Sequence, residues 1–166
     1  PMAITNAIEN LKYHNLVEVR GEKEKFIRFR HSRSKLWNIA YQQNLLESPV
    51  LKSVYVDEIP KGMVLLQSNE SALPEYTNLN PGKTLYYAIE KSVFYALQKS
   101  NALVNPNVYE GRYVLEIWKY NPLTLVGGLS DDLAAVDPLS LYLSVIDGKD
   151  ERLEMALEQL IKTHVW

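Results

Sequence analysis

The first fourteen residues alternate apolar and polar positions with the period of an α-helix. Apolar residues recur at spacings of three and four, which places them on one stripe of a helix from about Ala3 to His14. The stripe consists of Ile4, Ala7, Ile8 and Leu11. Thr5, Asn6 and Asn10 face away from it. The pattern therefore predicts an amphipathic helix whose exposed face can form hydrogen bonds.

The period changes to two between residues 16 and 30. Apolar residues alternate with charged residues, as in strands with one buried face. The interleaved charges are Glu18, Arg20, Arg28 and Arg30. A glycine, Gly21, and a charged run separate the two apolar segments. We therefore expect a β-hairpin with a charged tip.

A third amphipathic segment follows the hairpin. Ser32 or Ser34 is a suitable N-cap for its helix, which ends before Pro49 because the residue before a proline disfavours the helical region. The apolar positions of this helix are Leu36, Trp37, Ile39 and Ala40. We expect the helix to link the hairpin to the rest of the chain.

From Ser53 onward the pattern mixes strands and helices. It predicts a short helix over residues 70–78, a strand over 84–89 and a helix over 92–99. The clearest strand is Tyr113–Tyr120, which carries bulky side chains on both faces. We therefore expect this strand to be central in a sheet.

Two helices close the chain. Asp137 is a good N-cap, and Pro138 after it tolerates the first helical position. Asp150 starts the last helix. Its apolar stripe, which we expect to pack against the sheet, consists of Leu153, Ala156, Leu157, Leu160 and Ile161.

These elements predict an α+β fold in three parts. Residues 1–33 form a partial winged helix-turn-helix, made of a recognition helix and a wing hairpin. Residues 34–52 form the linking helix, and residues 53–166 form a mixed α/β domain with two C-terminal helices. A helix-turn-helix has supporting helices ahead of its recognition helix. We therefore expect the chain to be a piece of a longer protein.

Charge is distributed unevenly along the chain. Residues 1–40 carry eight Lys or Arg against four Glu, whereas the remainder carries ten bases against sixteen acids. The formal net charge of −2 conceals this asymmetry. Only the N-terminal part suits a polyanionic partner. A helix and a charged hairpin also occur as an ordinary solvated surface, and that interpretation stays open.

Composition restricts the class of protein. The chain has 166 residues, of which 46% are apolar, enough for a sizeable core. It contains no cysteine, which excludes disulfides, thiolate zinc sites and cysteine nucleophiles. No apolar run approaches the ~20 residues that span a bilayer. We expect a cytoplasmic protein with no membrane partner and no cofactor.

No segment predicts an active site or a metal site. Glu116 and Lys119 lie three positions apart on a strand, so their side chains point to opposite faces, unlike the acid and lysine of a metal-dependent nuclease. The run Gly127–Asp132 lacks the lysine of a phosphate-binding loop and is better explained as an acidic turn. The three histidines stand far apart, without the spacing of a metal site. We expect no catalytic and no metal-binding residues.

Two segments resemble known regulators. Residues 2–11, with the hairpin after them, resemble the recognition helix and wing of MarR-like winged-helix regulators. The run Val136–Leu143, followed by an acidic loop and an amphipathic helix, is similar to the C-terminal half of AbiEi-like abortive-infection antitoxins. A helix like that of residues 71–76 also lies mid-chain in those proteins. The resemblance implies a bacterial regulator that represses its own operon and opposes a nucleotidyltransferase-like toxin.

We therefore expect a bacterial winged-helix transcriptional regulator, antitoxin-like and autoregulatory, that binds double-stranded operator DNA. Phosphates would be held by Arg20, Lys23, Lys25, Arg28 and Arg30. Base edges would be approached by Thr5, Asn6 and Asn10. The alternative is a toxin-antagonising module that recognises its partner through the acidic surface after residue 40 without binding DNA. A degenerate nuclease-like domain is a third hypothesis, and a homodimer is compatible with each.

Overall fold

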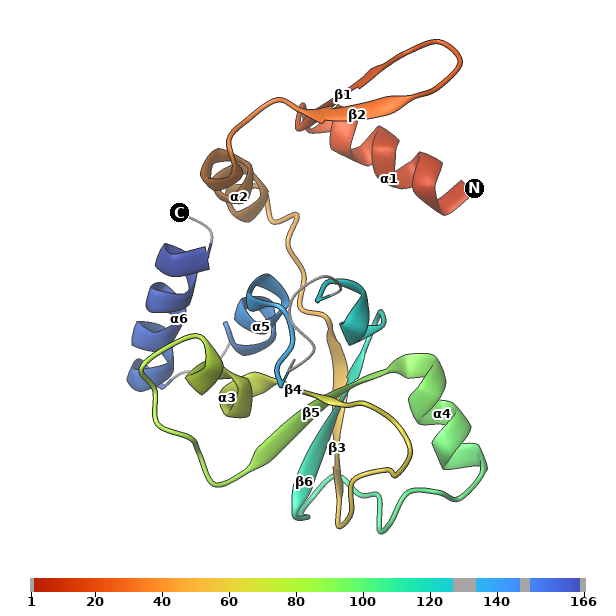
Figure 1. Ribbon diagram of the computed structural model, residues 1–166, viewed down its shortest axis with the longest axis vertical. Helices are drawn as coiled ribbons and strands as arrows, with labels where there is room; N and C mark the ends of the chain where they lie inside the picture. Colours follow the sequence, from red (N-terminus) through yellow and green to blue (C-terminus); the bar gives the residue numbers. More distant parts are fainter. Residues whose placement is uncertain (1, 127–133, 147–149, 165–166) are drawn as a thin grey trace. The chain divides into compact units, whose positions relative to one another are not determined.

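The computed structural model describes residues 2–126, 134–146 and 150–164. The fold is α+β, with six α-helices and two sheets within those residues (Figure 1). The chain divides into two compact units. The N-terminal unit extends to Leu46, and the C-terminal unit is Glu47–His164.

The N-terminal unit contains the predicted helix and hairpin. Its elements are α1 (Met2–Tyr13), β1 (Val17–Arg20), β2 (Phe26–Phe29) and α2 (Arg33–Gln42). Strands β1 and β2 pair antiparallel. Asn15, with a φ of 57°, turns the chain out of α1. Asparagine adopts this left-handed conformation more readily than most residues, which makes it a suitable helix stop.

The N-terminal unit has a small core. Among the described residues 2–46, Leu16 and Val17 are the side chains that count as buried. The predicted apolar stripe of α1 is only partly covered, because Ile8 and Leu11 are half-buried while Ile4 is 68% exposed. Most of this unit is therefore surface.

A four-stranded sheet forms the centre of the C-terminal unit. Its strands are β3 (Val50–Val56), β4 (Leu66–Gln67), β5 (Leu85–Glu90) and β6 (Tyr113–Trp118), in the order β3-β6-β5-β4. Strand β6 pairs antiparallel with β3 and parallel with β5. The prediction that this strand is central is confirmed.

Helices pack on both faces of the sheet (Figure 1). On one face, Phe94 of α4 (Lys91–Lys99) packs with Leu115 and Ile117 of β6. The other face, which carries Trp118, is covered by α3 (Asn69–Ala72), α5 (Pro138–Val145) and α6 (Glu151–His164). Two short 3-10 helices, Leu73–Glu75 and Pro122–Thr124, lie in the connections.

The two C-terminal helices begin and pack as predicted. A carboxylate oxygen of Asp137 accepts a hydrogen bond from the backbone N–H of Ser140 at 3.0 Å, so Asp137 is the N-cap of α5. The apolar stripe predicted for α6 is buried along its whole length. Four of its five members share one core with Trp118 of the sheet. None of the helices in the described ranges is long and apolar enough to cross a membrane.

Two expectations about boundaries need correction. The linking helix expected over 34–52 ends at Gln42, and β3 begins at Val50. The short helix expected over 70–78 is α3 followed by a 3-10 turn that ends at Glu75. The strand and helix expected over 84–89 and 92–99 are β5 and α4, each within a residue of the predicted start. The acidic run Gly127–Asp132 lies outside the described residues.

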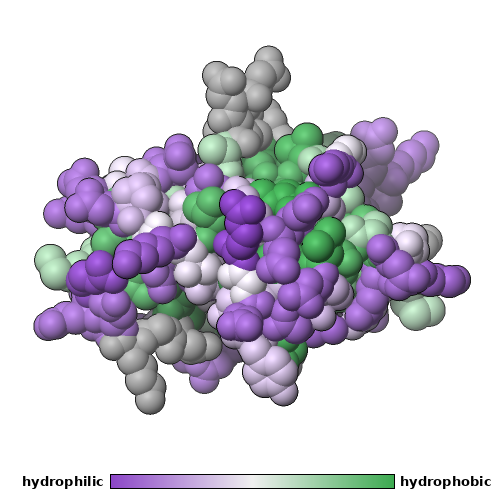
Figure 2. Space-filling model, turned by 90° about the horizontal axis from the view of Figure 1, so that it is seen from below, coloured by the Kyte–Doolittle hydropathy of each residue, from purple (hydrophilic) through white to green (hydrophobic). Residues whose placement is uncertain are grey.

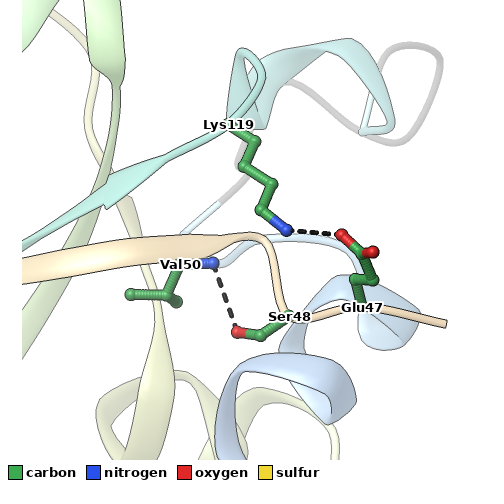
Figure 3. A network of polar contacts seen from close by, with 4 residues as sticks. All are labelled: Glu47, Ser48, Val50 and Lys119. Atoms are coloured by element: carbon green, nitrogen blue, oxygen red, sulfur yellow. Dashed lines mark hydrogen bonds and ion pairs between the residues drawn. The ribbon is translucent and has the colours of Figure 1, made fainter.

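Polar contacts anchor the start of β3. The backbone N–H of Val50 donates to the Oγ of Ser48 at 3.2 Å, and the Nζ of Lys119 lies 2.8 Å from the Oε2 of Glu47 (Figure 3). Lys119 follows directly after β6, so this ion pair joins the first residue of the C-terminal unit to the central strand.

Candidate nucleic-acid interface

The β1–β2 hairpin has two chemically different faces. Residues directly opposite each other in an antiparallel pair project to the same face. The register therefore gives one apolar face, made of Val17, Val19, Ile27 and Phe29. The second face, which we call the charged face, consists of Glu18, Arg20, Phe26 and Arg28. Because Val17 is buried and β1 packs on α1, the apolar face is the one turned towards the unit's small core.

The hairpin tip depends on Gly21. Its φ is +97°, a conformation that residues with a side chain rarely adopt. A Cβ at this position would also collide with the backbone carbonyl oxygen of Glu24. The chain therefore turns tightly here and presents the exposed side chains of Lys23 and Lys25 at the end of the hairpin.

One carboxylate lies between the arginines of the charged face. An Oε1 atom of Glu18 is 2.7 Å from Nη2 of Arg20 and 3.8 Å from Nη1 of Arg28. The arginine side chains are 59% and 63% exposed, so these ion pairs are in water and contribute little energy. Within the described residues, the three other predicted phosphate-binding residues, Lys23, Lys25 and Arg30, form no ion pair. All five basic side chains are exposed, and two of them share the carboxylate of Glu18.

The predicted base-reading residues of α1 are all exposed but do not share one face. Asn6 and Asn10 are four residues apart and lie one above the other on the helix. Thr5 lies about 140° around the helix from Asn10, since each residue turns about 100°. The structure brings the two asparagines together and separates the threonine from them.

The C-terminal end of α1 is held by a contact with the end of α2. The Nδ1 of His14 lies 2.8 Å from the Oε1 of Gln43. The ring of Tyr13 packs edge-on against that of His14, with centroids 5.0 Å apart. These contacts fix the helix relative to the following segment within the N-terminal unit.

The C-terminal unit contains one notable buried acid, Glu116 of β6. Asn69 Nδ2 donates to its Oε1 at 2.7 Å, and Trp118 Nε1 donates to its Oε2 at 3.4 Å. Burial raises the pKa of this carboxyl, although the hydrogen bonds oppose the shift. No group of three or more metal-binding side chains occurs in the described part of the chain. Through its bond to Asn69, Glu116 joins the start of α3 to β6.

Two residues that shape the hairpin surface were not given a place in the site from the sequence, although Glu18 was named among the interleaved charges. Glu18 lies between two arginines, and Phe26 stands on the charged face. Phe26 does not stand out in the period-two pattern, because Phe26, Ile27 and Phe29 are all apolar. The available signal was the period of two, which puts Phe26 on the same face of its strand as Arg28.

Comparisons with models of known families, with curated proteins and with solved structures found no match for this chain.

Proposed function

We propose that this chain is a DNA-binding transcriptional regulator of the winged-helix type. The observation that carries the proposal is the charged face of the hairpin, where Arg20 and Arg28 are exposed beside a lysine-bearing tip. Arginine and lysine bind phosphate oxygens, and such contacts fix a protein's register on the duplex. The hairpin is the wing in this arrangement.

Helix α1 is the element proposed to read sequence. The major groove admits an α-helix, and asparagine can bind the edge of adenine with two hydrogen bonds. Asn6 and Asn10, one turn apart, would reach neighbouring base pairs. Thr5 is proposed to contact a phosphate or a thymine methyl group at the side of the same groove.

Charge reversal on the hairpin tests the proposal. We expect Arg28→Glu with Arg30→Glu to weaken binding to a duplex strongly and to flatten the plot of log affinity against log salt. The slope changes by about one unit for each phosphate group that the protein no longer neutralises. The probe is a mixed-sequence duplex of about three helical turns, titrated over a range of salt concentrations.

The matched control places the same charge change on the other unit. Lys91→Glu with Lys99→Glu alters two exposed bases of α4 and should leave duplex affinity almost unchanged. If the hairpin variant retained the affinity and the salt slope of the wild type, DNA binding through this surface would be excluded.

A second candidate function is antagonism of a toxin by the C-terminal unit, and the outer face of α6 favours it. Met155, which is 70% exposed, lies on the side opposite the buried stripe, with Glu151 four residues before it and Glu158 three residues after it. Arg152 and Gln159 are its other helical neighbours. An exposed apolar side chain between two carboxylates suits a partner protein with a basic surface.

The test of this second function is a pull-down of the neighbouring gene's product with the full chain. We expect Met155→Lys with Glu158→Lys to abolish capture, while the Arg28→Glu and Arg30→Glu variant retains it. Equal capture by all three proteins would exclude α6 as the contact surface. A regulator that represses its own operon would combine both activities.

A further inference from the structure

Exposed apolar side chains are common on this molecule. Figure 2 shows hydrophobic residues between hydrophilic ones over the face that it presents. Since folded proteins in general expose much apolar surface, exposure alone marks no site. The position of an exposed apolar residue relative to charge and to the core is more informative.

Phe26 occupies an unusual position. Its side chain is 62% exposed, and it lies directly opposite Arg20 and two residues from Arg28 on the charged face. Alternate residues on a strand are about 7 Å apart. On the charged face, Arg20 thus lies across the ladder from Phe26 and Arg28 lies next to it along β2, and the ring is at the end of the hairpin, beside Gly21.

Incomplete packing of the small core of the N-terminal unit does not explain why the ring of Phe26 is exposed. The face turned towards α1 carries Val17, Val19, Ile27 and Phe29, and Phe26 points the other way. A segment or subunit that completed the core would cover Phe29 and Ile27 and leave Phe26 outside. The exposure of Phe26 therefore belongs to the surface that carries the arginines.

We propose that Phe26 is an apolar wedge that enters the minor groove of duplex DNA and partly unstacks one base step, while Arg20 and Arg28 bind the phosphates on either side. Proteins that insert apolar side chains in this way kink the duplex and gain contact area from the bend. Flexible pyrimidine–purine steps deform most easily and are the favoured sites. This inference rests on the proposed DNA binding of the hairpin. It adds that the protein selects DNA sequences by how easily their base steps deform.

The experiment uses the full chain and duplexes that carry 2-aminopurine at a central TA step. Binding of the wild type should raise 2-aminopurine fluorescence, because the probe brightens when it is unstacked. Phe26→Ala should lower affinity about ten-fold and remove the fluorescence rise. The salt slope should stay as in the wild type, since phenylalanine neutralises no phosphate.

The matched control is Phe29→Ala, which removes the same ring from the opposite face, where it is 57% exposed. It should leave duplex affinity and the fluorescence rise unchanged. Phe26→Trp should restore both, because indole keeps a flat apolar ring. Circular dichroism of each variant establishes that it is folded.

The outcomes separate the two proposals. If the wild type does not bind the duplex, the proposed function fails and this inference with it. If the wild type binds the duplex with a salt-dependent affinity but causes no fluorescence rise, the wedge is excluded and the proposed DNA binding stands. The same holds if Phe26→Ala binds as tightly as the wild type. If Phe26→Ala fails to fold, the wild type still tests the wedge, because absence of its fluorescence rise excludes it, and Phe26→Trp and Phe29→Ala remain to assign the rise to Phe26.

Discussion

Asn69 joins the helical layer to the central strand, because its Nδ2 donates to the Oε1 of Glu116 at 2.7 Å. The Oδ1 of the same residue accepts a hydrogen bond from the backbone N–H of Glu70 at 2.8 Å. Its φ of 50° is left-handed, which asparagine tolerates. One side chain thus fixes both the start of α3 and its position on β6.

The first prediction concerns Glu116 and pH. Burial raises the pKa of its carboxyl above the ordinary 4.5. The folded chain then keeps the proton to a higher pH than the unfolded chain does, so the free energy of unfolding falls as pH rises from about 4.5 towards the raised pKa. Glu116→Gln keeps an acceptor for Asn69 and has no proton to lose.

We therefore expect Glu116→Gln to remove this part of the pH dependence. Urea unfolding followed by circular dichroism, from pH 4.5 to 8, measures it. Parallel profiles for the variant and the wild type would show that Glu116 does not titrate in this range.

The second prediction concerns Tyr76. Its hydroxyl donates to the carbonyl oxygen of Val136 at 2.7 Å, and burial, with nearby Asp137 and Glu75, raises its pKa to about 12. Tyr76→Phe leaves this carbonyl without its donor and should lower the free energy of unfolding by about 1–2 kcal/mol. Thermal unfolding measures the decrease. Tyr109→Phe, at an 85% exposed tyrosine, should melt like the wild type, and equal melting of all three proteins would contradict the prediction.

The third prediction concerns the hairpin tip. Gly21→Ala should loosen the hairpin and weaken DNA binding, because the new methyl group collides with the carbonyl of Glu24. Gly62→Ala is the matched control. Gly62 also has a positive φ, +77°, but nothing lies within 4 Å of where its Cβ would be. Both variants carry the backbone strain of a positive φ, and only Gly21→Ala adds the collision.

Hydrogen exchange of residues 17–29, followed by mass spectrometry, reports the change at the tip. It should quicken in Gly21→Ala alone. Equal exchange in both variants would mean that the turn adapts to the methyl group.

The fourth prediction concerns Glu18. Its carboxylate neutralises part of the charge of Arg20 and Arg28 and would repel phosphate. Glu18→Gln should tighten duplex binding several-fold and steepen its salt dependence. Glu47→Gln removes one carboxylate from a surface ion pair of the other unit and should have almost no effect. Weaker binding by Glu18→Gln would show that the carboxylate positions the arginines for the duplex instead of competing with it.

The elements that the sequence predicts well are those whose signals are local. The cap at Asp137 and the stripe of α6 depend on residues within a few turns of each other. Strand β3 was missed because it lies at the edge of the sheet and exposes Leu51, Lys52 and Ser53, so its alternation is weak. Its partner β6 comes some sixty residues later, so the pairing cannot be recognised from the residues of β3 alone.

The same difference between local signals and strand pairing applies to the candidate site. The basic residues of the hairpin follow from composition and period. The period of two within β2 already puts Phe26 on the face of Arg28, whereas its place opposite Arg20 follows only from the register of β1 and β2, which the length of the tip sets. Thr5 was grouped with Asn6 and Asn10 as polar, although helical geometry separates it from Asn10.

The charged face of the hairpin contributes no side chain to the core of the N-terminal unit, which in the described residues 2–46 consists of Leu16 and Val17. Replacing residues there disturbs no packing, and surface substitutions of this kind usually alter stability by less than about 0.5 kcal/mol. Natural variation or laboratory selection can therefore substitute the residues of this surface, and so change its binding partner, without altering the fold of the unit.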